Sequence, residues 1–292
     1  MSREIVYIVP PEYAGKKLIA FLRGYVGISA RTAPKLKTDP EGLKRNGEHV
    51  RTIDRVNAGD EIRIRMPEEA GVIVPTAPKD LDIVYEDEDV LIVNKPGNLA
   101  VHPTHNHQGD TLANQVAGYL AGQGKQGVFR AVGRLDKTTS GLVVCALNKH
   151  AAFRLAGNYE KEYLALAGGV FTGAGTIDKP IYRPDPNKTL RAAGEHGERA
   201  VTHWEALGTN GSFSLLRVRL ETGRTHQIRV HFMSLGAPLL GDEMYGGDTS
   251  LISRAALHCE TVSFKHPVTG ERMRFSAPPP EDMQKLVKML KN

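Results

Sequence analysis

The sequence predicts an α+β fold divided into two domains. Runs that alternate apolar and polar residues, typical of strands, occur together with runs at helical spacing, without the regular alternation of a doubly wound parallel sheet. At 292 residues the chain exceeds the usual size of one domain. Composition changes in residues 67–80, PEEAGVIVPTAPKD, which contain three prolines. We therefore expect one domain at residues 1–70 and a larger one at residues 71–292.

The first 66 residues predict a helical start, a turn and a short β ending. Residues 15–26, GKKLIAFLRGYV, place apolar side chains at helical spacing, and residues 59–66, GDEIRIRM, alternate as a half-buried strand does. Asn-Gly at positions 46–47 is typical of a two-residue hairpin turn. Pro34 is expected to interrupt the basic segment between them, where a second helix would otherwise run.

The net charge of +5 belongs to the first quarter of the chain. Residues 1–66 hold 13 Lys and Arg against 8 Asp and Glu, whereas the remaining residues hold 25 of each sign. Such an excess is a feature of proteins that bind polyanions, although many basic proteins bind none.

Composition also excludes several classes. The N-terminal stretch MSREIVYIVPPEY lacks the uninterrupted apolar segment of a secretory signal, and the longest uncharged run, LALAGGVFTGAGTI, is too short and too rich in glycine to span a bilayer. Cys145 and Cys259 have no metal-like spacing. We expect a cytoplasmic protein with no membrane partner, whose cysteines are small core residues in a reducing compartment.

The region after residue 80 predicts strands separated by helices. Residues 81–97 contain two β segments and a Lys-Pro-Gly turn, LVVCALN at 142–148 is typical of a buried strand, and KEYLAL and SLLRVRLE are further short strands. In DTLANQVAGYLAG, Leu112, Val116 and Leu120 form an i, i+4, i+8 row that predicts a helix.

The sequence does not match the motifs of serine hydrolases, phosphate-binding loops or metal sites. Ser140 lacks the flanking glycines of a nucleophile elbow, and GGVFTGAGT lacks the Gly-Lys-Ser/Thr ending of a phosphate loop, so we interpret it as a turn between strands. His102, His105 and His107 have no carboxylate or cysteine at a supporting spacing, which favours solvated loop histidines or RNA contacts over a metal site. We expect no metal and no cofactor.

Five segments, in order and at plausible separations, resemble motifs of the RluA family of RNA pseudouridine synthases. They are NKPGNLAVHP, GRLDKTTSG, KEYLAL, ETGRTHQIRVHF and GDEMYGG, and the resemblance extends over residues 80–280. The N-terminal part resembles the small RNA-binding domain named after ribosomal protein S-four. The resemblance implies a pseudouridine synthase fold with a mixed, largely antiparallel central sheet, plus a small S-four-like α/β RNA-binding domain. It implies a substrate in RNA, large-subunit ribosomal RNA first and transfer RNA second, and we expect a monomer.

The resemblance also implies site residues. It assigns three catalytic residues, Asp136, Tyr163 and Arg229. It assigns three substrate contacts, Arg134, Ile228 and Arg224. The reaction breaks the bond from ribose carbon to uracil nitrogen and rejoins the base through a ring carbon. A carboxylate can attack the anomeric carbon or take a ribose proton, but in a dry pocket it needs a neighbouring cation to stay ionised. A tyrosine ring can stack on uracil, and its phenol can accept or relay a proton.

The resemblance further implies that Arg229 pairs with Asp136. It also implies that Arg134 fills the space that the flipped nucleotide leaves. We expect Thr225 to cap a helix that contains Arg229 and stops at Gly236, although a strand at this place also fits the pattern. Gly133 stands where the family often has histidine, which removes one possible contact to RNA.

Local hydrogen bonds of Thr138, Thr139 and Ser140 are expected to tighten the turn that follows Asp136.

Each residue taken alone has a structural alternative. Asp136 suits a turn, Tyr163 suits a half-buried strand, and the three arginines suit a solvated surface. At the level of function, two alternatives stay open. One is a non-catalytic RNA-binding or ribosome-assembly factor of the same fold, and the other is an N-glycosidase that admits water to the anomeric carbon.

Overall fold

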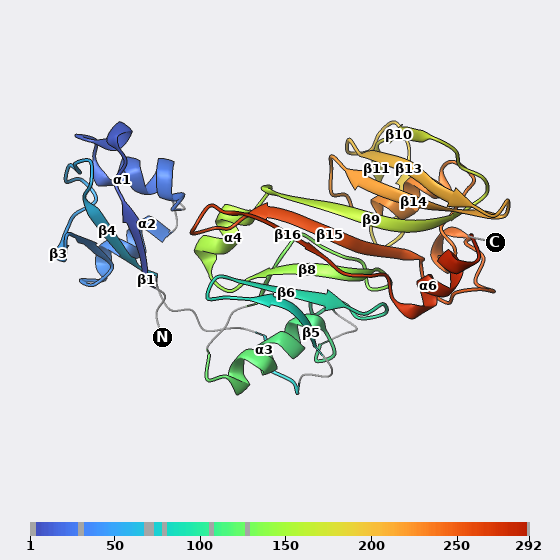
Figure 1. Cartoon of the computed structure of the whole chain (residues 1–292), viewed down its shortest axis with the longest axis horizontal. Helices are drawn as coiled ribbons and strands as arrows, with labels where there is room; N and C mark the ends of the chain where they lie inside the picture. The colour runs from blue at the N-terminus through green and yellow to red at the C-terminus, as the bar shows by residue number, and fades with distance from the viewer. Residues whose placement is uncertain are drawn as a thin grey trace.

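The computed structural model describes residues 4–28, 32–66, 73–77, 81–104, 108–125 and 129–290. In this part of the chain a small unit at residues 4–66 lies beside a larger unit that contains the long strands (Figure 1). The expected domain boundary after residue 70 falls on residues 67–72, outside the described residues. It therefore stays a prediction.

The small unit is an antiparallel sheet with strand order β1-β4-β2-β3, covered by short helices. Its elements are β1 (Glu4–Ile8), η1 (Pro11–Tyr13), α1 (Leu18–Phe21), the π-helical turn η2 (Leu22–Val26), α2 (Thr32–Thr38), β2 (Leu43–Arg45), β3 (Glu48–His49) and β4 (Glu61–Arg65). Asn46 and Gly47 have φ of 52° and 90° and close the β2–β3 hairpin, as predicted.

The expected interruption at Pro34 is wrong. Pro34 lies inside α2, as the third of the helical residues that the structure describes. In the first turn of a helix the backbone N–H has no intrahelical acceptor, so a proline there removes no hydrogen bond.

The small unit has an apolar core of its own. Ile62 and Ile64 alternate inward from β4 and pack with Leu18 and Phe21, and all four are fully buried. The predicted helical and strand periods of this segment are thus confirmed.

The small unit contacts the larger one near α4 (Lys149–Leu155). The Tyr7 hydroxyl lies 3.0 Å from Nε2 of His150, and Nη1 of Arg154 donates to the carbonyl oxygen of Tyr25 at 3.4 Å. Val268 packs against the core of the small unit.

The larger unit is built on a ten-stranded sheet of order β10-β13-β14-β9-β15-β8-β6-β5, with β16 added to β15 and β7 to β8. Its strands are β5 (Asp82–Glu86), β6 (Val90–Lys95), β7 (Arg130–Val132), β8 (Ser140–Ala146), β9 (Tyr159–Gly168), β10 (Ala174–Asp178), β13 (Val201–Thr209), β14 (Phe213–Leu220), β15 (Leu257–Lys265) and β16 (Arg272–Ser276). Among the described strands, β15 and β8 form the parallel pair and the others pair antiparallel. The predicted mixed, largely antiparallel sheet is confirmed.

The remaining elements cover or extend this sheet. They are α3 (Leu112–Gly122), α4, α5 (Gln227–Met233), η3 (Glu243–Tyr245), α6 (Glu281–Lys288) and the small ladder of β11 (Ile181–Tyr182) with β12 (Ala192–Ala193). Within the described ranges, none of the helices is both long and apolar enough to cross a membrane.

The centre of the sheet is β8. All seven of its residues are buried, as LVVCALN predicted, and the predicted row Leu112, Val116 and Leu120 of α3 belongs to the same core. Gly141 allows β15 to approach β8 closely, because a Cβ there would lie 2.3 Å from the carbonyl oxygen of Cys259 and its φ is 110°. The loop from β7 to β8, which carries Asp136, therefore begins and ends at the core of the sheet.

Candidate active site

Asp136 lies on a cleft of about 700 Å³ beside the central sheet. The walls of the cleft come from the β7–β8 loop, from β9, and from the connection between β14 and the first turn of α5. The structure brings all six predicted site residues to this cleft: Arg134, Asp136, Tyr163, Arg224, Ile228 and Arg229. Their segments are up to about ninety residues apart in the chain, so the tertiary fold assembles the site.

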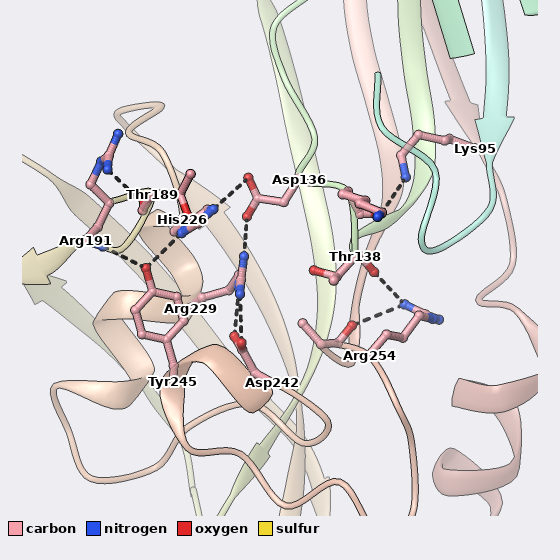
Figure 2. Close-up of polar contacts among 12 residues, drawn as sticks. Lys95, Asp136, Thr138, Thr189, Arg191, His226, Arg229, Asp242, Tyr245 and Arg254 are labelled. Atoms are coloured by element: carbon pink, nitrogen blue, oxygen red, sulfur yellow. Dashed lines mark hydrogen bonds and ion pairs between the residues drawn. The ribbon is translucent and has the colours of Figure 1, made fainter. Parts of the chain in front are cut away.

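Arg229 is the buried cation of the cleft. Its Nε and Nη2 donate to the two carboxylate oxygens of Asp242 at 2.7 and 2.8 Å, and its Nη1 donates to Oδ2 of Asp136 at 3.3 Å (Figure 2). Its guanidinium carbon also lies 4.9 Å from the centroid of the Tyr245 ring. The resemblance implied Asp136 as the partner of Arg229, whereas the shorter, bidentate contacts go to Asp242.

Asp242 changes the electrostatics of this pair. Burial alone would lower the pKa of Arg229, but the hydrogen bonds and charges of Asp242 and then Asp136 raise it. Arg229 therefore stays charged, and the two carboxylates share its charge. Because Asp242 fixes two nitrogens in one plane, the third is directed at Asp136 without freedom to rotate.

His226 and Tyr245 extend the network from the second carboxylate oxygen of Asp136. Nε2 of His226 lies 3.9 Å from Oδ1 of Asp136, its Nδ1 lies 2.8 Å from the Tyr245 hydroxyl, and that hydroxyl accepts the backbone N–H of Arg191 at 3.1 Å (Figure 2). Burial lowers the pKa of His226, opposed in part by the charge of Asp136. His226 is therefore mainly neutral at pH 7.

The predicted N-cap of the helix that contains Arg229 needs correction. The segment is a helix, which decides against the strand alternative, and it ends before Gly236 with its φ of 74°. However, α5 begins at Gln227, and the N-cap residue is His226 in a left-handed conformation with no side-chain cap. Thr225 does not cap it. The left-handed turn at His226 brings that residue and Arg229 to the same side of Asp136.

Tyr163 and Ile228 form the apolar part of the cleft. Tyr163 lies on β9, paired with Val218 and Cys259, and both Tyr163 and Ile228 are buried. Burial raises the pKa of Tyr163 well above its ordinary value, and nearby charges including Asp136 act in the same direction. The phenol is thus neutral, which suits stacking and hydrogen-bond donation better than acceptance of a proton.

Arg224 and Arg134 lie at the edge of the cleft and differ in whether they already have a carboxylate partner. Arg224 forms an ion pair with Glu198, and its Nε donates to the carbonyl oxygen of Arg199 at 3.1 Å. Arg134 is exposed and has no carboxylate partner among the described residues. Arg134 can therefore meet a phosphate or a base without first breaking an ion pair.

Comparison with known proteins agrees with this geometry. The sequence profile of the family described as "RNA pseudouridylate synthase" matches residues 89–234. A protein of Bacillus subtilis (strain 168), "Uncharacterized RNA pseudouridine synthase YjbO", is 39% identical over 91% of this chain and 96% of its own length. The chain belongs to the RNA pseudouridylate synthase family.

Two further similarities support the assignment of this synthase. "Ribosomal large subunit pseudouridine synthase D" of Xanthomonas campestris pv. campestris is 35% identical over 97% of this chain and 92% of its own. The solved structure of "Human RNA Pseudouridylate Synthase Domain Containing 1" is similar with a TM-score of 0.57, at 27% identity over 75% of this chain and 98% of that one. The resemblance found in the five motifs is confirmed.

Two buried cations of the synthase hold the backbone immediately after Asp136. Nζ of Lys95 donates to the carbonyl oxygens of Pro96 at 2.8 Å and Lys137 at 3.3 Å, and Nη1 of Arg254 donates to that of Thr138 at 3.2 Å (Figure 2). Burial, and then the charge of Arg254, lower the pKa of Lys95 to about 7. These contacts fix the loop independently of its own side chains.

The expected local hydrogen bonds in this turn form only in part. The backbone N–H of Thr139 donates to the carbonyl oxygen of Asp136 at 3.1 Å. The Ser140 hydroxyl instead lies 3.0 Å from Nδ1 of His258 on β15, and the buried Thr138 hydroxyl has no hydrogen-bond partner in the described part of the chain. The prediction was wrong for Thr138 and Ser140, because distant elements hold the turn.

Sequence reasoning assigned no role to five residues of this network: Lys95, His226, Asp242, Tyr245 and Arg254. A signal existed for four, because Lys95, His226, Asp242 and Tyr245 stand inside the quoted motifs. Arg254 stands outside every motif, and nothing in its local sequence marks it.

One group of potential metal ligands occurs among the described residues, Asp87, Asp89 and His266, and it does not line the cleft. Asp87 already accepts hydrogen bonds from the Tyr85 hydroxyl and from the backbone N–H groups of Asp89 and Val90. His105 and His107, considered as ligands in the sequence, lie outside the described residues.

Proposed function

We propose that this synthase isomerises uridines of large-subunit ribosomal RNA, with Asp136 as the carboxylate that acts on the ribose. The observation that carries the proposal is the meeting of Asp136, Arg229 and Tyr163 in one cleft from three separate segments. The ribosomal substrate is supported by relatives such as the Xanthomonas protein, whose name specifies the large ribosomal subunit.

The residues of the cleft have complementary roles in this reaction. The ionised Asp136 attacks the anomeric carbon or removes a ribose proton, and Arg229 keeps it oriented. Tyr163 stacks on the target uracil, and Ile228 packs against its edge. Arg134 occupies the place that the flipped nucleotide leaves, which offsets part of a flipping cost of a few kcal/mol.

Arg224 is proposed to contact RNA at the rim of the cleft. Since it is paired with Glu198, a phosphate must displace that carboxylate. Arg224 therefore contributes to binding through an exchange of partners, and its removal affects affinity more than the rate of the chemical step.

Residues 1–70 are proposed to hold structured RNA while residues 71–292 perform the reaction, in a monomer that acts in the cytoplasm. The excess of basic residues in the first 66 supports this division. It predicts binding that weakens steeply with salt, since phosphate contacts release counterions.

A map of pseudouridine across all RNA, made from cells with and without the protein, tests the proposal. Sites in large-subunit ribosomal RNA should disappear without the protein and return with the wild-type chain but not with Asp136→Asn. If only pseudouridine sites in transfer RNA disappear, the substrate is transfer RNA and not ribosomal RNA. Sites restored equally by Asp136→Asn would overturn the assignment of the carboxylate, and free uracil in place of pseudouridine would indicate a glycosidase.

A further inference from the structure

Lys161 is a cation of the cleft that the proposed mechanism does not use. Residues two apart on a strand face the same side, so β9 places Tyr159, Lys161 and Tyr163 on one face. All three line the cleft. Lys161 is thus the neighbour of Tyr163 on the surface where the target base is proposed to stack.

Among the described residues, no carboxylate forms an ion pair with Lys161. The groups that face it are the ring of Tyr159, whose centroid is 5.2 Å from Nζ, and the buried thiols of Cys145 on β8 and Cys259 on β15. Burial lowers the pKa of Lys161, whereas burial raises the pKa of both thiols. The thiols are therefore neutral at pH 7 and do not compensate the ammonium.

Gly133 is what allows this arrangement. A Cβ at position 133 would lie 1.9 Å from the Tyr159 hydroxyl and 3.3 Å from Nζ of Lys161, and φ of Gly133 is 77°. Because Gly133 has no side chain, the Tyr159 hydroxyl and the Lys161 ammonium occupy the space beside it. The position that often carries histidine in this family is filled from β9 instead.

The other buried or paired cations of the cleft each have a carboxylate. Arg219 pairs with Glu162, Arg224 with Glu198 and Arg229 with Asp242. No ion pair joins Lys161 to a carboxylate in the described ranges, and the same holds for the exposed Arg134. A partly buried ammonium without a counter-ion is costly unless a ligand supplies the charge.

We propose that Lys161 stabilises the negative charge that develops on uracil when its bond to the ribose breaks. In that step the bond between C1′ and N1 breaks and its electron pair stays with the base, which becomes an anion. The base then turns, and C5 bonds to C1′ while Asp136 either releases its bond to C1′ or returns the ribose proton that it removed. The C5 proton leaves to solvent, and N1 takes a proton from solvent. Lys161 transfers no proton and acts by charge alone.

The position of Lys161 favours the base over a phosphate as its partner. Its Nζ lies among Tyr159, Cys145 and Cys259, two of which are fully buried. A phosphate carries a full charge before and after reaction, so it would have to be desolvated to reach this place. A uracil carries charge only after the bond has begun to break, which makes the interaction stronger in the transition state than in the bound substrate.

This inference rests on the proposed function, and one assay separates the two. Large-subunit ribosomal RNA transcribed in vitro with tritium at C5 of uridine releases tritium when uridine becomes pseudouridine. Release by the wild type but not by Asp136→Asn supports the proposed function regardless of Lys161. The same RNA then serves for Lys161→Met, which removes the charge, keeps most of the length of the side chain in its apolar surroundings and should fold.

Lys161→Met should slow single-turnover release at saturating protein by about 100-fold, the size found when one preorganised donor to a developing anion is removed. The Kd for RNA and its salt dependence should not change. Lys285→Met serves as the matched control, because Lys285 is an exposed lysine of α6 paired with Glu281, and this variant should react like the wild type.

The pH profile distinguishes charge from packing. Because the pKa of Lys161 is lowered, its charge and the rate should be lost at a pH below the ordinary range of lysine. Lys161→Arg should restore part of the rate and move this alkaline limb to higher pH, since arginine stays charged. In Tyr159→Phe, the rate is expected to fall at the same alkaline pH as in the wild type.

Three results would overturn the proposal. One is an unchanged single-turnover rate in Lys161→Met. A second is a weaker Kd with a salt slope reduced by about 0.7 to 0.9 at an unchanged rate, which would make Lys161 a phosphate contact. The third is an alkaline limb that Lys161→Arg does not move, which would assign that limb to another group.

Discussion

Replacing Asp242 by asparagine should cost more stability than replacing Asp136, although only Asp136 is proposed to act on the ribose. The Asp242 side chain is 1% exposed and accepts two hydrogen bonds from Arg229 at 2.7 and 2.8 Å. The Asp136 side chain is 20% exposed and accepts one at 3.3 Å. Breaking a buried ion pair costs about 3 to 5 kcal/mol, because the remaining charge stays desolvated. For Asp136→Asn we expect about 1 kcal/mol, the net contribution of one ordinary hydrogen bond.

The free energy of unfolding in urea, measured for the wild type and both variants, tests this difference. Tritium release should be lost in Asp136→Asn, which stays nearly as stable as the wild type. Asp242→Asn should be much less stable and should react slowly even when folded, because Arg229 is no longer held toward Asp136. Stability and activity are thus expected to separate between the two carboxylates.

A double variant provides the control. Arg229→Met with Asp242→Leu removes both buried charges and keeps apolar volume, so it should recover most of the stability that Asp242→Asn loses. It should not recover activity, since Asp136 would have no cation. The reasoning is refuted if Asp136→Asn lowers the free energy of unfolding as much as Asp242→Asn, because Asp136 would then be the main partner of Arg229.

Three further predictions follow from buried groups and close contacts. Lys95 has a pKa of about 7 in the folded chain against about 10.4 when unfolded, so between these values the unfolded state binds more protons. The stability of the wild type relative to Lys95→Met should therefore rise with pH in urea titrations from pH 7 to 10, and a flat difference would contradict the shift. Gly133→Ala should lower the melting temperature and the rate, because its Cβ would clash with the Tyr159 hydroxyl at 1.9 Å, and a wild-type melting curve would exclude that clash. Tyr7→Phe removes the hydroxyl contact with Nε2 of His150 and should weaken the association of the two units by about 1 kcal/mol, measured as earlier proteolysis between them, whereas unchanged cleavage would show that the hydroxyl contact adds nothing.

Local patterns in the sequence were sufficient for most elements of the fold. The rows of apolar residues in α3 and β8 predicted their buried faces, and Asn46-Gly47 predicted its hairpin, because the backbone geometry of each depends on near neighbours. Two errors came from the same local view. Pro34 was judged without knowing its place in the first turn of α2, and Thr225 without knowing that His226 adopts a left-handed conformation.

For the candidate site, too, the sequence predicted the residues but not the distances between them. The motifs named six of the residues that line the cleft, since the resemblance transfers positions one at a time. It did not show that Asp242 is the closer partner of Arg229, or that Lys161 forms no ion pair in the part of the chain that the structure describes. Those facts depend on distances between segments that are remote in the chain.

The sequence by itself determined which residues are polar, where strands and helices form, and which family the motifs belong to. Only the tertiary structure decided how charges are shared around Asp136, because Coulomb interactions and desolvation depend on distance and burial, neither of which a linear pattern records. Arg254 is the clearest case. Its local sequence marks nothing, yet the packing of β15 and α6 brings it to the loop that carries Asp136 and makes it a support of the site.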